Sequence, residues 1–81
     1  MDNKKFIEKS IKSAKGLCNH ATELFPNKEQ KAQRKLYIDG VINAADGIFI
    51  DLMKSGIISE EMFRKITATY GKAAYEAGEI N

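Results

Sequence analysis

The sequence contains few of the residue types on which several classes of protein depend. It holds one cysteine, one proline, one histidine and no tryptophan. A single cysteine cannot close a disulfide within the chain, which excludes a disulfide-stapled secreted domain and favours a reducing compartment, the cytoplasm. The chain has no apolar run of about 18 residues, the least that a membrane-spanning helix needs. Its first residues are charged where a secretory signal is apolar, so we expect no targeting segment and no membrane association.

The length of the chain permits one helical domain, residues 1–81, with a small core. Domains below about 80 residues commonly need a disulfide, a metal or a partner subunit for stability. The softest metal ligands, Cys18 and His20, are two positions apart, a spacing that points them to different faces of a helix. We therefore expect no metal and no cofactor. A partner subunit remains as the plausible support.

The spacing of apolar residues predicts an all-α fold, an antiparallel bundle of three helices over residues 3–25, 28–55 and 60–77 that oligomerisation completes. In each segment, apolar residues recur at alternating intervals of three and four, as on one face of a helix. Pro26 ends the first helix, because the residue before a proline disfavours the α conformation. Asn27 can cap the second helix, with Gln30 as its capping-box partner.

The boundary between the second and third helices carries strong local signals. Gly56 suits the left-handed position that follows a helix, and Ile57 can fold back as in a Schellman motif. Ser59 is a favourable N-cap, and Glu60 and Glu61 follow it in the positive first turn of the next helix.

The stretch Leu52-Met53-Lys54-Ser55-Gly56-Ile57-Ile58-Ser59-Glu60-Glu61-Met62-Phe63 resembles the SHOCT family of short bacterial helical modules. The resemblance lies in the order of leucine, glycine, isoleucine, serine, acidic pair and phenylalanine, and it is confined to residues 52–66. The chain departs from the family at Thr67–Tyr70, where lysine and leucine are usual. SHOCT modules are regarded as small oligomerisation or tethering pieces, which is what the resemblance implies here.

A second interpretation concerns residues 35–51. Asp39-Gly40 and Asp46-Gly47 are dipeptides that favour tight hairpins, and β-prone residues flank them. A small sheet there would make the fold α+β. The continuous seven-residue periodicity favours a helix, in which each interior glycine costs about 1 kcal/mol relative to alanine.

Two features of the second helix predict an interface. Its C-terminal half is apolar on most sides, and a lone three-helix subunit would expose a contiguous patch there. The patch comprises Ile48, Phe49, Ile50 and Met53. Gly40, Ala44 and Gly47 form a row of small residues beside it, matched by a row on the third helix from Thr67 to Gly78. The two rows either pack against each other or leave a face for another subunit or a ligand.

The charge is unevenly distributed, with a net +5 over residues 1–35 and −3 over residues 36–81. The basic residues form two groups on helical faces. The first group is Lys5, Lys9 and Lys12; the second is Lys28, Lys31, Arg34 and Lys35. They either keep the protein in solution or bind a phosphate-bearing partner such as a nucleotide or nucleic acid. Asp39, Asn43 and Asp46 share another face, and we expect them to be solvated.

The sequence contains no motif of an enzyme active site. We expect Cys18 to be an inert core residue and His20, at the edge of the apolar stripe, to have either a packing or a surface role. The resulting hypothesis is a small non-enzymatic, homo-oligomeric adaptor or inhibitor that acts through protein–protein contacts, in the style of phage or mobile-element accessory proteins. The alternative is an anion binder that sequesters a nucleotide-like ligand or contacts nucleic acid through its lysine-rich faces.

Overall fold

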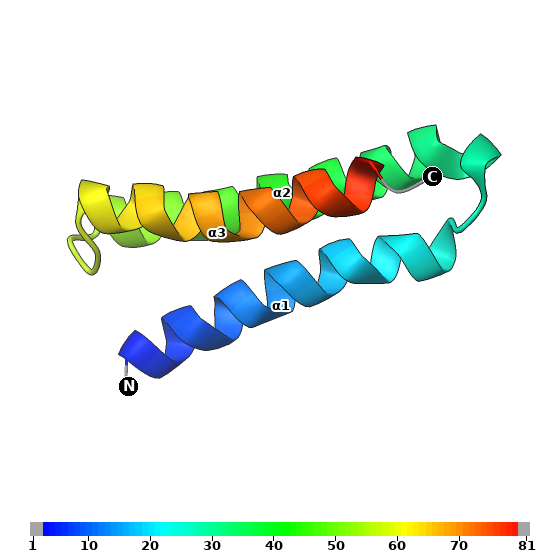
Figure 1. The fold of residues 1–81 in the computed structure, drawn as a ribbon. Helices are drawn as coiled ribbons and strands as arrows, with labels where there is room; N and C mark the ends of the chain where they lie inside the picture. Colours follow the sequence, from blue (N-terminus) through cyan, green and yellow to red (C-terminus); the bar gives the residue numbers. More distant parts are fainter. Residues whose placement is uncertain (1–2, 80–81) are drawn as a thin grey trace.

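The computed structural model describes residues 3–79, and this part of the chain contains three α-helices and no strand. Helix α1 spans Asn3–Leu24, α2 spans Lys31–Lys54 and α3 spans Glu60–Glu79, and one 3-10 turn, η1, covers Lys28–Gln30. Successive helices run in opposite directions and every pair is in contact (Figure 1). The predicted all-α, antiparallel three-helix bundle is confirmed, and the hairpin interpretation of residues 35–51 is wrong.

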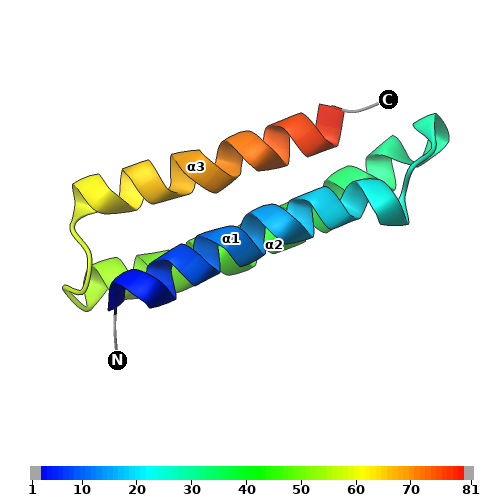
Figure 2. The ribbon, with the colours of Figure 1, turned by 60° about the horizontal axis from the view of Figure 1, so that its bottom comes forward.

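The bundle is elongated, with extents of 43 × 19 × 15 Å. α1 begins near the turn between α2 and α3, and α3 ends near the connection between α1 and α2 (Figures 1 and 2). The molecule therefore has two ends of different construction. We call them the turn end and the connection end. None of the helices in the described part is long and apolar enough to cross a membrane.

Local signals end and start the helices as the sequence predicts. At the connection end, Pro26 follows the last turn of α1, and the Asn27 N–H donates to the Gln30 side-chain oxygen at 3.1 Å. The first turn of the second helical segment is 3-10 rather than α, so α2 itself begins at Lys31, three residues later than predicted.

The turn end is a Schellman motif followed by an N-cap. Gly56 has a φ of 77°, which L-residues with side chains rarely adopt. The Ile57 N–H donates to the Leu52 carbonyl and the Gly56 N–H to the Met53 carbonyl, each at 3.0 Å. The Ser59 hydroxyl then accepts from the Met62 N–H at 3.0 Å and opens α3.

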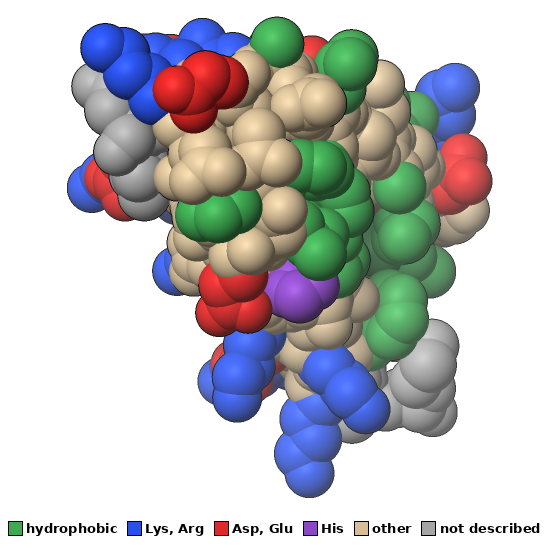
Figure 3. All heavy atoms as spheres, turned by 90° about the vertical axis from the view of Figure 1, so that its right-hand side faces the viewer, with side chains coloured by type: hydrophobic (Ala, Val, Ile, Leu, Met, Phe, Trp, Pro, Cys, Tyr) green, Lys and Arg blue, Asp and Glu red, His purple; other side chains and the backbone are tan. Residues whose placement is uncertain are grey.

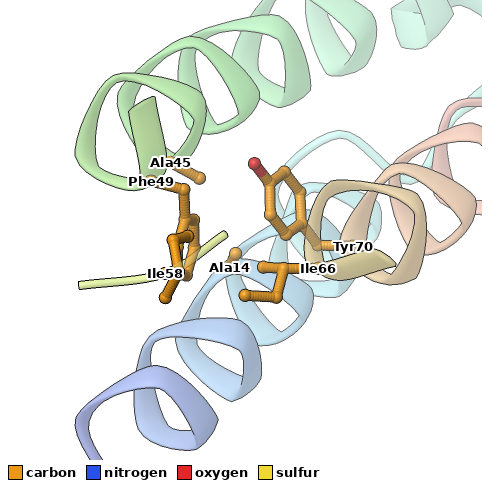
Figure 4. Packing of buried hydrophobic residues seen from close by; sticks show 6 residues of the cluster. All are labelled: Ala14, Ala45, Phe49, Ile58, Ile66 and Tyr70. Carbon is orange, nitrogen blue, oxygen red and sulfur yellow. The ribbon is translucent and has the colours of Figure 1, made fainter. Parts of the chain in front are cut away.

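The core has two clusters, one for each end. At the turn end, large side chains from α2, α3 and the intervening turn meet over Ala14 of α1 (Figure 4). Phe49 and Tyr70 stack there, with ring centroids 5.9 Å apart. At the connection end, the cluster is built mainly of small residues: Cys18, Ala21, Ile38, Ala74 and Ala77.

Candidate interaction face between α1 and α2

An open groove of about 440 Å³ runs between α1 and α2 on the outside of the bundle. Its walls are mostly apolar, and we call it the α1–α2 groove. Ala14 and Ala45, which also belong to the core, form part of its lining. The remaining lining residues are Phe6, Lys9, Ser10, Ser13 and Leu17 from α1, with Val41, Ala44 and Ile48 from α2.

Large apolar side chains stand exposed along this groove. Leu17 is 44% exposed and Ile48 is 47% exposed, although both line it. Leu24 is 45% exposed and lies two helical turns beyond Leu17 on the same side of α1. Figure 3, which views the molecule from the connection end, shows hydrophobic side chains gathered beside the histidine. The α1–α2 face therefore keeps apolar area in contact with solvent at Leu17 and Ile48.

The predicted patch on α2 is only partly at the surface. Ile48 is exposed, but Phe49 is 1% exposed and belongs to the core, so its assignment to an exposed interface was wrong. Ile50 and Met53 are half-buried, and Met53 packs against the core. The physical reason is that α2 contacts both α1 and α3, so a wide apolar surface is satisfied within one chain.

The two rows of small residues do not pack against each other. A Cβ added at Gly40 or Gly47 would meet no atom within 4 Å, so these positions face open space. Gly78, in the other row, lies instead against Lys35, whose Cγ is 3.6 Å from such a Cβ. Gly40, Ala44 and Gly47 thus form a flat, exposed strip along α2 beside the groove. Packing within the subunit does not explain these glycines.

The second basic group is a structural clamp at the connection end. Arg34 is 0% exposed and donates from Nη1 to the Phe25 carbonyl at 2.7 Å, so its assignment as an anion-binding surface residue was wrong. Lys31 and Lys35 hold the Glu79 carboxylate between them at 3.2 and 2.9 Å. Hydrogen bonds from Lys35 and Lys31 lower the pKa of Glu79. Lys28 is exposed at the start of η1.

The first basic group stays at the surface. Lys5, Lys9 and Lys12 are all exposed on α1. Lys9 lines the α1–α2 groove. Neither Lys9 nor Lys12 forms an ion pair with another residue in the part that the structure describes. Lys9 and Lys12 are therefore available to a partner, in contrast to Lys31 and Lys35.

The cysteine and the histidine do not form a reactive site. Burial raises the pKa of the Cys18 thiol, and Cys18 is 0% exposed. His20 is exposed, with Nδ1 3.2 Å from a Glu23 carboxylate oxygen. Within residues 3–79, no three His, Cys, Asp or Glu side chains gather closely enough to hold a metal.

Sequence reasoning missed two features of this molecule. The first is the contribution of α1 to the groove, for which Leu17 and Leu24, seven residues apart beside the core stripe, were an available signal. The second is Asp46, which was expected to be solvated. It is half-buried and accepts a hydrogen bond from the hydroxyl of the buried Tyr70.

Comparison with known proteins adds no relative: no family model, no curated protein and no solved structure matches this chain. The SHOCT resemblance of residues 52–66 therefore stays a prediction.

Proposed function

We propose that this chain is a non-enzymatic, homo-oligomeric protein-binding module of the cytoplasm, an adaptor or inhibitor that acts through contacts on its α1–α2 face. The observation that supports the proposal most is the groove itself, in which Leu17 and Ile48 are each nearly half exposed, with Leu24 exposed further along α1.

The energetic gain from covering the face is substantial for a domain of this size. Full burial of a leucine or isoleucine side chain contributes about 1.5–3 kcal/mol, so removing the exposed halves of three such residues from water contributes roughly 2–4 kcal/mol. The net stability of small domains is only about 5–15 kcal/mol. This gain is gross, and the freedom that the two partners lose on association is subtracted from it.

Light scattering behind size exclusion, over a range of protein concentrations, tests the proposal. We expect a species larger than the 9.1 kDa chain that dissociates on dilution. Ile48→Lys should make the protein monomeric, because it places a charge in the apolar groove. Met62→Lys is the matched control, since Met62 is 46% exposed but lies on α3, outside the groove. A wild-type chain that is monomeric at every concentration would contradict the proposal.

A second candidate function is anion binding through Lys5, Lys9 and Lys12. What supports it is that Lys9 and Lys12 are exposed and form no ion pair within the described part of the chain. Clustered ammonium groups bind polyphosphates or nucleic acid by releasing counterions, so affinity should fall steeply with salt. Binding of a labelled oligonucleotide, measured by fluorescence anisotropy at two salt concentrations, tests this function. Loss of binding in Lys12→Glu but not in Lys65→Glu would support it.

A further inference from the structure

We propose that the α1–α2 groove binds an acidic amphipathic helix of another protein. The apolar stripe of that helix enters the groove, and its glutamate or aspartate side chains face Lys9 and Lys12. The inference rests on the binding role proposed for this face and names the chemistry of the partner. Three observations support it: the charge of the groove lining, the lysines beside it and the length of the groove.

The lining of the groove carries charge of one sign. Lys9 is the only charged residue among the described residues that line it. Glu8 and Asp39 line two other hollows, and Asp46 accepts its hydrogen bond from the core. Asp51 is exposed on α2 but is not part of the lining. A partner that enters this groove therefore meets a cation and no acid, which favours carboxylates at the edge of its apolar stripe.

The lysines on this side of α1 have no acid of their own to release. Lys9 and Lys12 are exposed and three residues apart, so they are neighbours on the surface of the helix. Neither forms an ion pair within residues 3–79. Two carboxylates one turn apart on a partner helix have the same spacing and can face both lysines. The partner thus gains two cations without displacing an intramolecular ion pair.

The length and the walls of the groove suit a helix. Phe6 and Leu17 are the first and last lining residues of α1, and Val41 and Ile48 are those of α2. The distance from Phe6 to Leu17 along α1 is about 16 Å, or three turns of helix. A helix of that length offers apolar side chains at positions i, i+3 or i+4 and i+7, as in other helix-in-groove complexes. Its binding would cover the exposed parts of Leu17 and Ile48.

A nucleic acid fits this groove less well than a protein helix does. Single strands bind to rows of aromatic side chains beside a basic channel. Phe6 is the only aromatic residue among the described residues that line the groove, and Lys9 is the only cation. Most of the wall is apolar and would stay uncovered by phosphates. The observations therefore favour the helix, and an oligonucleotide serves as a competing probe.

Two synthetic peptides test the charge of the partner. Both are alanine-rich and about 18 residues long, so that they form helices in water, and both carry leucines at positions i, i+3 and i+7. One has glutamates beside the leucine stripe, and the other has lysines at the same positions. Fluorescence anisotropy of the labelled peptides gives the dissociation constants. At low salt, the wild-type chain should bind the glutamate peptide at least about tenfold more tightly than the lysine peptide.

Three variants locate the binding site. Lys9→Glu should weaken binding of the glutamate peptide about tenfold or more and strengthen binding of the lysine peptide, because it reverses the charge of the lining. Lys15→Glu is the matched control: it makes the same change in net charge at an exposed position of α1 outside the lining, and it should largely keep the preference. Leu17→Ala should weaken both peptides by a similar factor, because it removes apolar area that both cover.

The possible results distinguish this inference from the proposed function. A chain that self-associates in light scattering, but shows no preference for the glutamate peptide or keeps it in Lys9→Glu, would overturn the inference and leave the proposed homo-oligomer standing. A monomeric chain that binds the glutamate peptide through Lys9 would support the inference and contradict the homo-oligomer. A monomeric chain that binds neither peptide would overturn both. Binding of a labelled oligonucleotide but of neither peptide would overturn the inference in favour of anion binding.

Discussion

The two ends of the bundle are held together by different means. At the turn end, Phe49, Tyr70, Ile58 and Ile66 bury large apolar side chains between the helices (Figure 4). At the connection end, the apolar cluster consists mostly of alanines and a cysteine, and the largest buried side chain of the described chain, Arg34, is polar. The comparison teaches that one end depends on apolar burial, and the other on polar links that join α2 to its neighbours.

The difference between the two ends follows from how much each kind of buried residue contributes to the stability of the fold. Burial of a large apolar side chain contributes about 1.5–3 kcal/mol, whereas an alanine contributes far less. Small residues let the helices come close but bury little area. At the connection end, the bond from Arg34 to the Phe25 carbonyl and the pairing of Glu79 with Lys31 and Lys35 fix α2 to the ends of α1 and α3. The following substitutions test the contrast, from the largest expected effect to the smallest.

Phe49→Ala should have the largest effect, because it empties the centre of the turn-end cluster and removes the stacking with Tyr70. Truncation of a buried phenylalanine costs about 3–5 kcal/mol of unfolding free energy. Urea unfolding followed by circular dichroism measures the loss. Leu36→Ala is the control on the same helix, since Leu36 is 72% exposed, and it should change stability by less than about 0.5 kcal/mol. Equal losses in the two variants would refute the assignment of the core.

Arg34→Ala should break the connection end and cost about 2–3 kcal/mol. The change removes a charged donor from the Phe25 carbonyl, and it also removes the packing of the long side-chain stem. Lys28→Ala, an exposed basic residue at the same end, serves as control and should be nearly neutral. Hydrogen exchange adds a spatial readout, because the amides at the end of α1 should lose protection before those of the turn end. Uniform loss of protection would argue against an independent role for this link.

Tyr70→Phe should cost about 1–2 kcal/mol, since it leaves the half-buried Asp46 carboxylate without its donor while the ring remains in the core. The same residue makes stability depend on alkaline pH. Burial, and then the hydrogen bond to Asp46, raise the pKa of Tyr70 in the folded state above its ordinary value. The folded state therefore holds a proton that the unfolded state releases, and stability falls as pH rises above about 10. That alkaline loss should be smaller in Tyr70→Phe and unchanged in Tyr75→Phe, which alters an exposed ring.

The sequence was most informative where structure is set by neighbours in the chain. Pro26, Gly56 and Ser59 predict helix boundaries because a proline ring, a positive φ and a capping hydroxyl act over one turn. The structure has these boundaries, with the predicted Schellman and capping hydrogen bonds. The three helices and their antiparallel order follow from the same local signals and from apolar periodicity.

The candidate site was harder to predict, because it depends on which side of each helix meets which neighbour. Periodicity identifies an apolar stripe but not how many helices share it. Phe49 was therefore expected at the surface, although it fills the space between α2 and α3. Arg34 was assigned by its charge, although small core residues at its end of the bundle leave room for a long buried side chain. Gly40, Ala44 and Ile48, which were predicted to form an interface, are exposed at the surface, and their role in an interface stays a prediction.

The smallest expected effect is that of Glu79→Gln, which removes the anion held by Lys31 and Lys35 at the connection end. The two lysines lower the pKa of Glu79 in the folded state, so its carboxylate contributes to stability above its unfolded pKa, and that contribution is lost as pH falls through the folded value. The wild type should consequently lose stability in acid more steeply than the variant, whose amide does not titrate.

Thermal unfolding at pH 7 and at about pH 3 measures this difference, and added salt should reduce it, because the three side chains are partly exposed to solvent. Glu23→Gln is the matched control, since it changes an exposed glutamate beside His20 on α1 and leaves the clamp intact. If Glu79→Gln and the wild type lost stability in parallel between the two pH values, the clamp would be an ion pair without consequence for folding. The connection end would then depend on Arg34 alone among its polar links.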